Sequence, residues 1–476
     1  MVDRRYDLVI LGSGSTAFSA ALRAAELGKS VIMTEERTVG GTCVNRGCLP
    51  SKNLIEAARI IHEARNPRYP GIEPAEIGFD FAELIHQKDD IVAGYRDQKY
   101  ESLANDSERI DIAHGRVAFV NYHTVEVGGE SIEAEKFLVA LGSSAVVPEI
   151  KGLDETPFMT SDLLTSDEEM ELTELPESLI IIGGGYIALE LGQMFSRFGS
   201  RVTILERSDQ VLKHGYEPQV GRAVQQILHD EGLDVRTGSR IRRVRPAEEG
   251  VLVELESGDE IRAEKLLLAT GRRPNTKGVG LEKAGVETGA AGEVLVDECL
   301  RTSAHHIFAA GDVIGAETGS EMATPVGAHD GKIVAENAFS GNGMRSVDHS
   351  VIPRAIFTDP QIGIVGVTEE EAIAQGHHCW CRTIPMELVP RAKAIHDTRG
   401  IIKMVADADT DKVLGVSMVG ANAAEVIHEA AMGLRFGATI DDFIDMIHVY
   451  PTMAEALKIA AISRHKDPAK LSCCAE

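Results

Sequence analysis

Short apolar runs alternate with helix-like segments along much of the chain. The first apolar run, residues 6–11, is followed by a glycine-rich turn, an alanine-rich segment that ends at Gly28, and a second apolar run over residues 30–35. This order predicts a strand, a turn, a helix and a second strand. The pattern therefore indicates an α/β fold at the start of the chain.

The same pattern occurs a second time. Residues 178–182 are an apolar run, a glycine turn and a helical segment follow, and residues 201–206 are again strand-like. In each copy an acidic residue, Glu35 or Glu206, follows the first glycine of the turn by 23 positions. The turn residues that we assign to nucleotide binding are Gly12, Gly14 and Ala17 in the first copy, and Gly183 and Gly185 in the second.

Such a turn has a specific use. Its glycines let the backbone approach a pyrophosphate at a helix N-terminus, and the acidic residue can bind a ribose hydroxyl. Two copies predict two bound nucleotides. A flavin and a nicotinamide cofactor are the natural pair, because a hydride can pass between them.

The composition narrows the class of protein. A chain of 476 residues suggests about three domains of roughly 150 residues each. The net charge of −26 argues against nucleic acid or an anionic membrane as a partner. No apolar run is long enough for a transmembrane helix, and strand-like sequence begins by Tyr6, so we expect neither a membrane span nor a signal peptide. Seven cysteines without a secreted-type framework indicate mostly reduced thiols in a cytoplasm.

Two of these cysteines lie in a distinctive stretch, residues 40–52, which reads Gly-Gly-Thr-Cys-Val-Asn-Arg-Gly-Cys-Leu-Pro-Ser-Lys. Cys43 and Cys48 are close enough to cycle between a disulfide and a dithiol beside a redox cofactor. A static disulfide and half of a zinc site are the alternatives. Zinc would require a second pair of ligands with Cys/His spacing, and the sequence has none.

This stretch resembles the active site of the flavin-dependent pyridine nucleotide-disulfide oxidoreductases, and the resemblance covers nearly the whole chain. It implies that the first nucleotide fold holds FAD and the second holds the nicotinamide cofactor. Cys48 would lie nearer the flavin, and Cys43 would face the substrate. Lys52 would lie near the flavin and pair with Glu190. Tyr186 would cover the nicotinamide pocket until the cofactor displaces it.

Other segments carry the same resemblance. Residues 302–312 resemble the family's second flavin motif, whose aspartate, here Asp312, binds the ribityl chain. Residues 269–275 resemble the turn that closes the nicotinamide domain, and residues 322–326 resemble the segment under the flavin ring. Further positions that we expect at the cofactors are Gly41, Thr42, Lys52, Gly115, Gly142, Gly271 and Ala323.

The resemblance also implies a domain order. An FAD-binding domain over residues 1–150 is interrupted by a NAD(P)-binding domain over residues 151–273 and resumes over residues 274–345. Residues 346–476 form a C-terminal α+β dimerisation domain. The expected fold is thus α/β, with two Rossmann-like domains and a dimerisation domain. In this family each active site combines residues from both subunits of a homodimer.

The C-terminal domain is the part of the chain that distinguishes family members with different substrates. Family members that reduce disulfides carry a His-Pro-Thr followed by an acidic residue, and the histidine shuttles the proton of the leaving thiol. Here Tyr450 stands in the place of that histidine, while Glu455 is retained. A phenol with an unperturbed pKa of about 10 cannot do the same task at neutral pH. His448 is an alternative base, although its position is usually structural in this family.

The C-terminus is the second place, after Tyr450, where the sequence differs from the family members that reduce disulfides. Adjacent Cys473 and Cys474 can hold one soft cation between two thiolates; a vicinal disulfide and an incidental reactive tail are the alternatives. Together with Tyr450, this pair resembles the family members that reduce Hg(II) to Hg(0). We therefore expect Cys473 and Cys474 of the partner subunit to take Hg(II) from small thiols and pass it to Cys43 and Cys48, with Tyr450 orienting the metal-thiolate complex, in mercury detoxification.

Some features leave alternatives. Members of the family usually use NADPH; Glu206 favours the free ribose hydroxyl of NADH, whereas Arg207 could pair with the 2′-phosphate of NADPH. The competing functions are a flavin-dependent reductase of lipoamide or another small disulfide, and a protein that only sequesters metal. Cys379 and Cys381 lie on one face of a predicted strand, and we expect a structural role for them because no other soft ligand is nearby in sequence.

Overall fold

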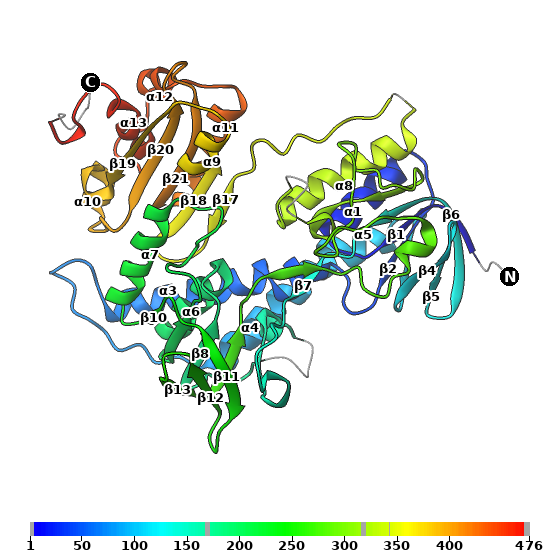
Figure 1. Cartoon of the computed structure of the whole chain (residues 1–476), viewed down its shortest axis with the longest axis horizontal. Helices are drawn as coiled ribbons and strands as arrows, with labels where there is room; N and C mark the ends of the chain where they lie inside the picture. The colour runs from blue at the N-terminus through cyan, green and yellow to red at the C-terminus, as the bar shows by residue number, and fades with distance from the viewer. Residues whose placement is uncertain (1–3, 167–171, 316–319, 342, 471–476) are drawn as a thin grey trace.

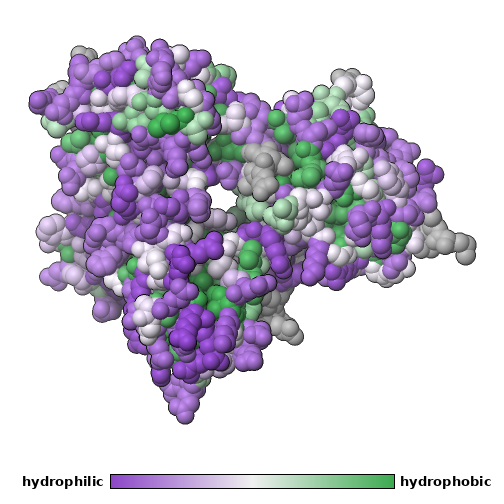
Figure 2. All heavy atoms as spheres, in the orientation of Figure 1, coloured by the Kyte–Doolittle hydropathy of each residue, from purple (hydrophilic) through white to green (hydrophobic). Residues whose placement is uncertain are grey.

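A computed structural model describes residues 4–166, 172–315, 320–341 and 343–470. The chain forms three lobes (Figure 1). The space-filling view shows an opening through the molecule between these lobes (Figure 2). Among the described residues, no helix has both the length and the apolar character needed to cross a bilayer.

The first lobe contains a seven-stranded sheet. β1 (Arg4–Leu11) lies at its centre and pairs in parallel with β2 (Val31–Glu35) and β6 (Glu130–Val139). Residues 8–11 of β1 are fully buried, as expected for a parallel strand covered on both faces. β16 (Ile307–Ala309) joins the sheet beside β6, so the chain returns to this lobe late in the sequence. The other strands are β3 (Ile110–His114), β4 (Val117–Asn121) and β5 (Thr124–Val127).

Two helices far apart in sequence pack against each other in this lobe: α1 (Ser15–Glu26) and α8 (Thr324–Phe339). Their approach requires glycine, because a Cβ on Gly331 would lie 2.2 Å from the carbonyl oxygen of Thr16. The start of α8 is thereby fixed beside the glycine turn that precedes α1.

The second lobe repeats the strand–turn–helix–strand unit. β8 (Ser178–Ile182), α6 (Tyr186–Phe198) and β9 (Arg201–Leu205) follow one another, and β14 (Lys265–Leu268) pairs with β8 on its other side. The predicted order of elements is therefore present in both copies. The lobe is completed by α7 (Pro218–Asp230), β10 (Asp234–Arg236), β11 (Ile241–Pro246), β12 (Val251–Leu255) and β13 (Glu260–Ala263).

The third lobe is a five-stranded antiparallel sheet in the order β17-β18-β21-β20-β19. Its strands are β17 (Arg354–Ile356), β18 (Gln361–Gly366), β19 (Cys379–Pro385), β20 (Ile401–Asp407) and β21 (Val413–Gly420). Its helices are α9 (Glu369–Ala374), α10 (Pro390–Ala394), α11 (Ala423–Arg435), α12 (Ile440–Asp445) and α13 (Glu455–Ile462).

Several segments link the lobes. α3 (Cys48–Arg65) belongs in sequence to the first lobe, but its Leu54, Ala58 and Ile61 share one hydrophobic core with α6 of the second lobe. β7 (Ser143–Ala145) pairs with β15 (Arg272–Pro274) where the chain enters and leaves the second lobe. The remaining helices are α2 (Gly41–Arg46), α4 (Phe81–Arg96), the π-helix η1 (Asp97–Glu101) and α5 (Ser102–Asn105). The 3₁₀ turns are η2 (Leu153–Glu155), η3 (Ser161–Leu164), η4 (Leu281–Ala284), η5 (Gly311–Ile314), η6 (Met386–Leu388) and η7 (Pro468–Lys470).

Candidate active site

The glycine turn after β1 is a cradle made of backbone. Gly12 has φ +115°, and a Cβ there would lie 2.3 Å from the carbonyl oxygen of Ala140, so only glycine fits. Gly14 precedes α1, and no side chain caps the helix N-terminus. A Cβ on Gly41 would lie 2.8 Å from the Cα of Gly14. The first amides of α1 are thus open to an anion, with no side chain from Gly14 or Gly41 in the way.

Glu35 ends β2 at the edge of this turn. The Ser13 hydroxyl and the backbone N–H of Arg37 both donate hydrogen bonds to its carboxylate, the latter at 2.6 Å. The carboxylate is therefore held beside the turn, where a ribose hydroxyl could also donate to it.

The second turn has the same geometry. Gly183 also has φ +115°, and a Cβ there would lie 2.3 Å from the carbonyl oxygen of Ala269. The backbone N–H groups of Gly184 and Ser208 each donate to the Glu206 carboxylate at 2.6 Å. α6 begins one residue after Gly185 with no side-chain cap, and the neighbouring Arg207 is exposed. The two copies match in conformation as well as in spacing.

Cys43 and Cys48 lie on consecutive helices, α2 and α3, which are separated by Gly47. Both thiols are free in this structure, and they are hydrogen-bonded to each other. Cys48 is the first residue of α3, and a helix N-terminus stabilises a thiolate. The Thr324 hydroxyl, at the start of α8, is hydrogen-bonded to both cysteines.

The two thiols differ strongly in acidity. The hydrogen bond from Cys43 lowers the pKa of Cys48 to about 6; Lys52 and Thr324 also lower it, while burial and Glu190 oppose them. The same hydrogen bond, together with burial, raises the pKa of Cys43 far above its usual range. At neutral pH the pair therefore holds one thiolate, on Cys48, and one proton, on Cys43.

The expected ion pair between Lys52 and Glu190 is present. Lys52 Nζ lies 2.7 Å from Glu190 Oε2, and the Glu190 side chain is only 5% exposed. The backbone N–H of Phe357, from the third lobe, donates to the other carboxylate oxygen at 2.8 Å, and Lys52 Nζ lies 4.8 Å from the centre of the Phe357 ring. All three lobes thus meet at this pair, one helical turn from Cys48.

Tyr186 begins α6 and keeps 40% of its surface exposed. Partial burial raises its pKa to about 12; Arg272 opposes this, while Glu190 and Asp312 add to it. The phenol is therefore neutral at physiological pH and lies within electrostatic range of residues from the first and second lobes.

The remaining predicted positions surround the two turns. The Ser143 hydroxyl donates to Asp312 at 2.6 Å. Gly115 donates its N–H to the carbonyl of Glu35 at 2.8 Å, directly after β3. Gly142 and Gly271 both have positive φ and face open space where a Cβ would stand. The other predicted positions lie next to elements already described: Ala17 in α1, Thr42 in α2, and Ala323 as the residue before α8.

The predicted site residues near the C-terminus, Tyr450 and Glu455, lie in the third lobe. Tyr450 is 49% exposed, and Ile447 and Val449 beside it are 93% and 77% exposed. Glu455, at the start of α13, accepts a hydrogen bond from the Thr452 N–H at 3.3 Å, and burial raises its pKa. Cys473 and Cys474 lie outside the described residues.

His448 is held inside the protein, with 4% of its side chain exposed. Its Nε2 lies 2.8 Å from Glu429 Oε1, and its Nδ1 lies 3.2 Å from the carbonyl oxygen of Met446. Both ring nitrogens have partners, which favours the structural alternative for this histidine over a working base.

The contacts of two site residues were not predicted from the sequence. Thr324 belongs to the segment 322–326 that the resemblance places under the flavin ring, but its contact with Cys43 and Cys48 was not predicted. Ser13 lies inside the glycine motif, yet the motif does not require a hydroxyl there. Both residues matter because of long-range contacts that local sequence does not encode.

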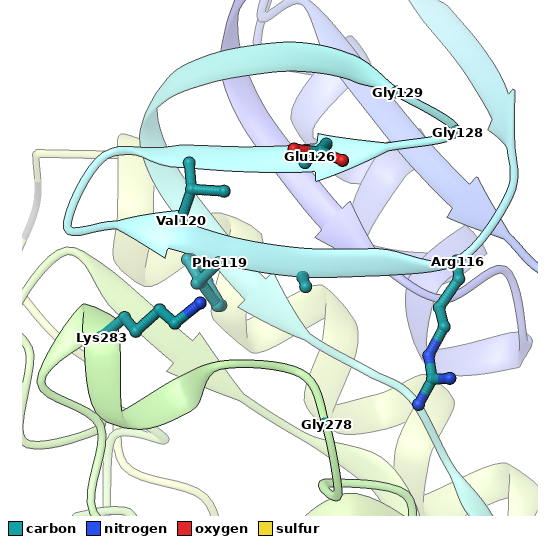
Figure 3. A pocket seen from close by; sticks show the side chains of 9 residues that line it. Arg116, Phe119, Val120, Glu126, Gly128, Gly129, Gly278 and Lys283 are labelled. Carbon is teal, nitrogen blue, oxygen red and sulfur yellow. The ribbon is translucent and has the colours of Figure 1, made fainter.

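A separate groove of about 450 Å³ lies on the first lobe (Figure 3). It is formed by the β4–β5 hairpin and the segment around Gly278, and the side chains of Arg116, Glu126 and Lys283 lie along it. It contains neither a cysteine nor a nucleotide turn, so we do not assign the chemistry to it.

Comparison with known proteins agrees with this geometry. Residues 6–331 match the family described as pyridine nucleotide-disulphide oxidoreductase, and residues 352–461 match its dimerisation domain. A mercuric reductase from Staphylococcus aureus is 42% identical over 99% of this chain and 85% of its own length. A mercuric reductase from Streptomyces lividans is 44% identical over 99% of this chain and 98% of its own length. A solved structure also matches: the Cu(II) complex of the HOCl-induced flavoprotein disulfide reductase RclA from Escherichia coli. It superposes with a TM-score of 0.86 over 97% of this chain and 100% of its own, and the two sequences are 32% identical.

Proposed function

The chain belongs to the pyridine nucleotide-disulphide oxidoreductase family, and from this premise we propose that it reduces Hg(II) to Hg(0) with electrons from NAD(P)H, as a means of mercury detoxification. The observation that carries the proposal is the Cys43–Cys48 pair, one thiolate and one thiol in direct contact, beside an open nucleotide cradle. The sequence similarity to proteins named mercuric reductase, over almost the whole chain, supports the choice of metal.

The residues present fit a flavin and a nicotinamide cofactor. The cradle of Gly12, Gly14 and Gly41 leaves room for a pyrophosphate, and Glu35 can accept from a ribose hydroxyl. Asp312, which accepts a hydrogen bond from Ser143, would also accept one from the ribityl chain. The second cradle offers the same features for the nicotinamide dinucleotide. When bound, FAD takes a hydride from the nicotinamide and supplies an electron pair to the site.

Cys43 and Cys48 would bind the Hg(II) ion. The Cys48 thiolate can displace one small thiolate from a Hg(II) bis-thiolate complex, and Cys43 can displace the second small thiolate, which takes the Cys43 proton and leaves as a thiol. Thiolates are suitable ligands because soft sulfur selects soft metals. Two electrons then convert the bound Hg(II) to Hg(0) and leave both cysteines as thiolates. The positive charge of Lys52 favours that state.

We assign delivery of the metal to the dimer. Cys473 and Cys474 of the partner subunit would receive Hg(II) from small thiols, and Tyr450 of the partner subunit would orient the complex. The exposed apolar side chains of Ile447 and Val449 support burial of this segment against a second subunit. We place the enzyme in the cytoplasm, where NADPH and reduced thiols are available.

We propose NADPH as the preferred coenzyme, with NADH also accepted. Glu206 is held by two backbone N–H groups and can accept from a free 2′-hydroxyl. The adjacent, exposed Arg207 can pair with a 2′-phosphate. The two residues thus favour different coenzymes.

The test is steady-state NADPH oxidation by the purified holoenzyme with Hg(II) and excess small thiol, with the released Hg(0) measured in the gas phase. We expect turnover that depends on Hg(II). When thiols are bulky, deleting Cys473 and Cys474 should reduce it, whereas Cys299→Ser should not. Turnover on lipoamide or glutathione disulfide, with Hg(II) acting only as an inhibitor, would refute the proposal.

Cu(II) reduction is the second candidate, because a structure that superposes closely on this one is a Cu(II) complex. The same assay with Cu(II) in place of Hg(II), and a Cu(I) chelator to record the product, separates the two. We expect a higher kcat/KM for Hg(II); the reverse order would assign the enzyme to copper.

A further inference from the structure

Cys379 and Cys381 form a second dithiol, outside the site described above. They lie on β19, the edge strand of the third-lobe sheet, and β19 pairs regularly with β20 along both residues. Trp380, between them, packs against the hydrophobic core, and the Arg464 guanidinium lies 5.7 Å from its ring centre. Because side chains alternate along a strand, both thiols must lie on the opposite face from the tryptophan.

The two thiols are close together and unlinked. They are hydrogen-bonded to each other, and both are free and half-buried. Alternate residues of a strand have Cα atoms roughly 6.6 Å apart, near the upper limit for a disulfide. A metal ion bridging two sulfurs spans about 4.6 Å if each bond has the 2.3 Å length of a zinc–thiolate bond. A disulfide is therefore near its geometric limit at this spacing, whereas a metal ion can bridge two neighbouring sulfurs without a covalent bond between them.

The number of ligands selects the kind of metal. Within the described part of the chain, no group of three or more His, Cys, Asp or Glu side chains is placed to hold a metal ion. The neighbouring His377 and His378 have their Nδ1 atoms 2.7 and 3.0 Å from Asp407 and Asp409. A structural zinc ion needs four ligands, which this strand does not offer. Hg(II) is satisfied by two thiolates in a line.

We propose that Cys379 and Cys381 bind one Hg(II) ion as a bis-thiolate, as a site distinct from Cys43 and Cys48. The exchange is balanced: Hg(II) bound to two small thiolates passes to the protein, and the two protein thiols give their protons to the departing thiolates. No oxidant or reductant takes part. The inference goes beyond the proposed function, because it concerns binding without turnover.

The electrostatics of the strand agree with such a site. Burial, followed by the charge of Glu369, raises the pKa of Cys379, and the same causes raise that of Cys381 to about 12. Lys403 acts in the opposite direction, but it is already hydrogen-bonded to Glu217 and Glu369 at 2.7 and 2.6 Å. Two separate thiolates are therefore disfavoured here. Binding of Hg(II) converts a neutral dithiol into a neutral bis-thiolate complex, so it does not require a buried net charge.

The test uses the only tryptophan of the chain, Trp380, as a reporter between the two cysteines. The background variant carries serine at Cys43, Cys48, Cys473 and Cys474. HgCl₂ is added in the presence of a several-fold excess of a monothiol, and bound Hg is counted after gel filtration. We expect one Hg(II) per chain and quenching of Trp380 fluorescence by the heavy atom.

Adding Cys379→Ser and Cys381→Ser should abolish both signals, whereas adding the matched control Cys299→Ser should leave both unchanged. Equal Hg(II) binding with and without the two extra substitutions would overturn the proposal. So would a background variant that retains no Hg(II). Circular dichroism of each variant shows whether it is folded, and Cys379→Ser alone, which leaves a single thiolate, should also lose the ion.

Discussion

Replacing Lys52 with methionine should raise the pKa of Cys48, and replacing Glu190 with glutamine should lower it. The two side chains act on the Cys48 thiolate with opposite signs: the ammonium stabilises it and the carboxylate repels it. Methionine retains much of the length of lysine without its charge. Glutamine keeps a carbonyl oxygen that can accept the hydrogen bond from Phe357 N–H.

The size of the lysine effect follows from geometry. Lys52 is four residues after Cys48 on α3, where Cβ atoms are roughly 5–6 Å apart. Unit charges at this distance interact with about 3 kcal/mol at an effective dielectric constant near 20. The Lys52 side chain is 29% exposed, and solvent reduces this to about 1–2 kcal/mol. At 1.36 kcal/mol for each pKa unit, the Cys48 pKa should rise by about one unit, to about 7.

The assay is the pH dependence of Cys48 alkylation by iodoacetamide in the reduced protein, followed on the Cys48 peptide by mass spectrometry. We expect a midpoint at about 6 for the wild type, a higher one for Lys52→Met and a lower one for Glu190→Gln. Lys265→Met, which removes a charge paired with Glu264 in the second lobe, is the control and should not shift the midpoint. Equal shifts in the same direction for Lys52→Met and Glu190→Gln, or no shift for Lys52→Met, would refute the reasoning.

Three further predictions concern the rest of the molecule. Gly41→Ala places a Cβ 2.8 Å from Gly14 in a residue with φ +68°, so flavin bound per purified chain should fall several-fold, while Gly28→Ala, with open space around it, should keep its flavin. Arg207→Ala should lower kcat/KM for NADPH by about tenfold, the value of one charge-assisted hydrogen bond, and leave NADH unchanged; an equal loss for both would contradict the assignment. Burial raises the pKa of Asp359, but the charges of Arg197 and Arg399 outweigh it and hold the pKa below its usual value. Stability from this carboxylate is therefore present above about pH 4 and is lost as the pH falls through the folded-state pKa. The difference in melting temperature between wild type and Asp359→Asn should shrink below about pH 4. A difference that does not change with pH would contradict this reasoning.

The nucleotide folds could be predicted from the sequence because their signals are local. A buried strand, a glycine turn and a helix follow one another within one short segment, and Gly12 and Gly183 are required by backbone contacts that recur in both copies. The fold class and the predicted pairing of Lys52 with Glu190 are confirmed, although these two residues are 138 positions apart. That pairing came from the family resemblance, not from the local pattern.

Other parts of the site depend on how the lobes meet. The contact of Thr324 with the cysteines requires α8 to pack on α1, which is set by the fit of Gly331 against Thr16. His448 could not be assigned before its partner Glu429 was known, because a histidine two positions from the expected base could serve either role. Sequence specifies such residues only through the complete fold.

The central claim is tested most directly by counting electrons against metal. Purified enzyme receives a limited amount of NADPH with excess Hg(II) and small thiol, and the Hg(0) swept into the gas phase is compared with the NADPH consumed. We predict one Hg(0) for each NADPH, and loss of Hg(0) release in both Cys43→Ser and Cys48→Ser with flavin content unchanged. NADPH consumption without Hg(0), or Hg(0) release that survives both substitutions, would contradict the assignment of Cys43 and Cys48 as the site of mercury reduction.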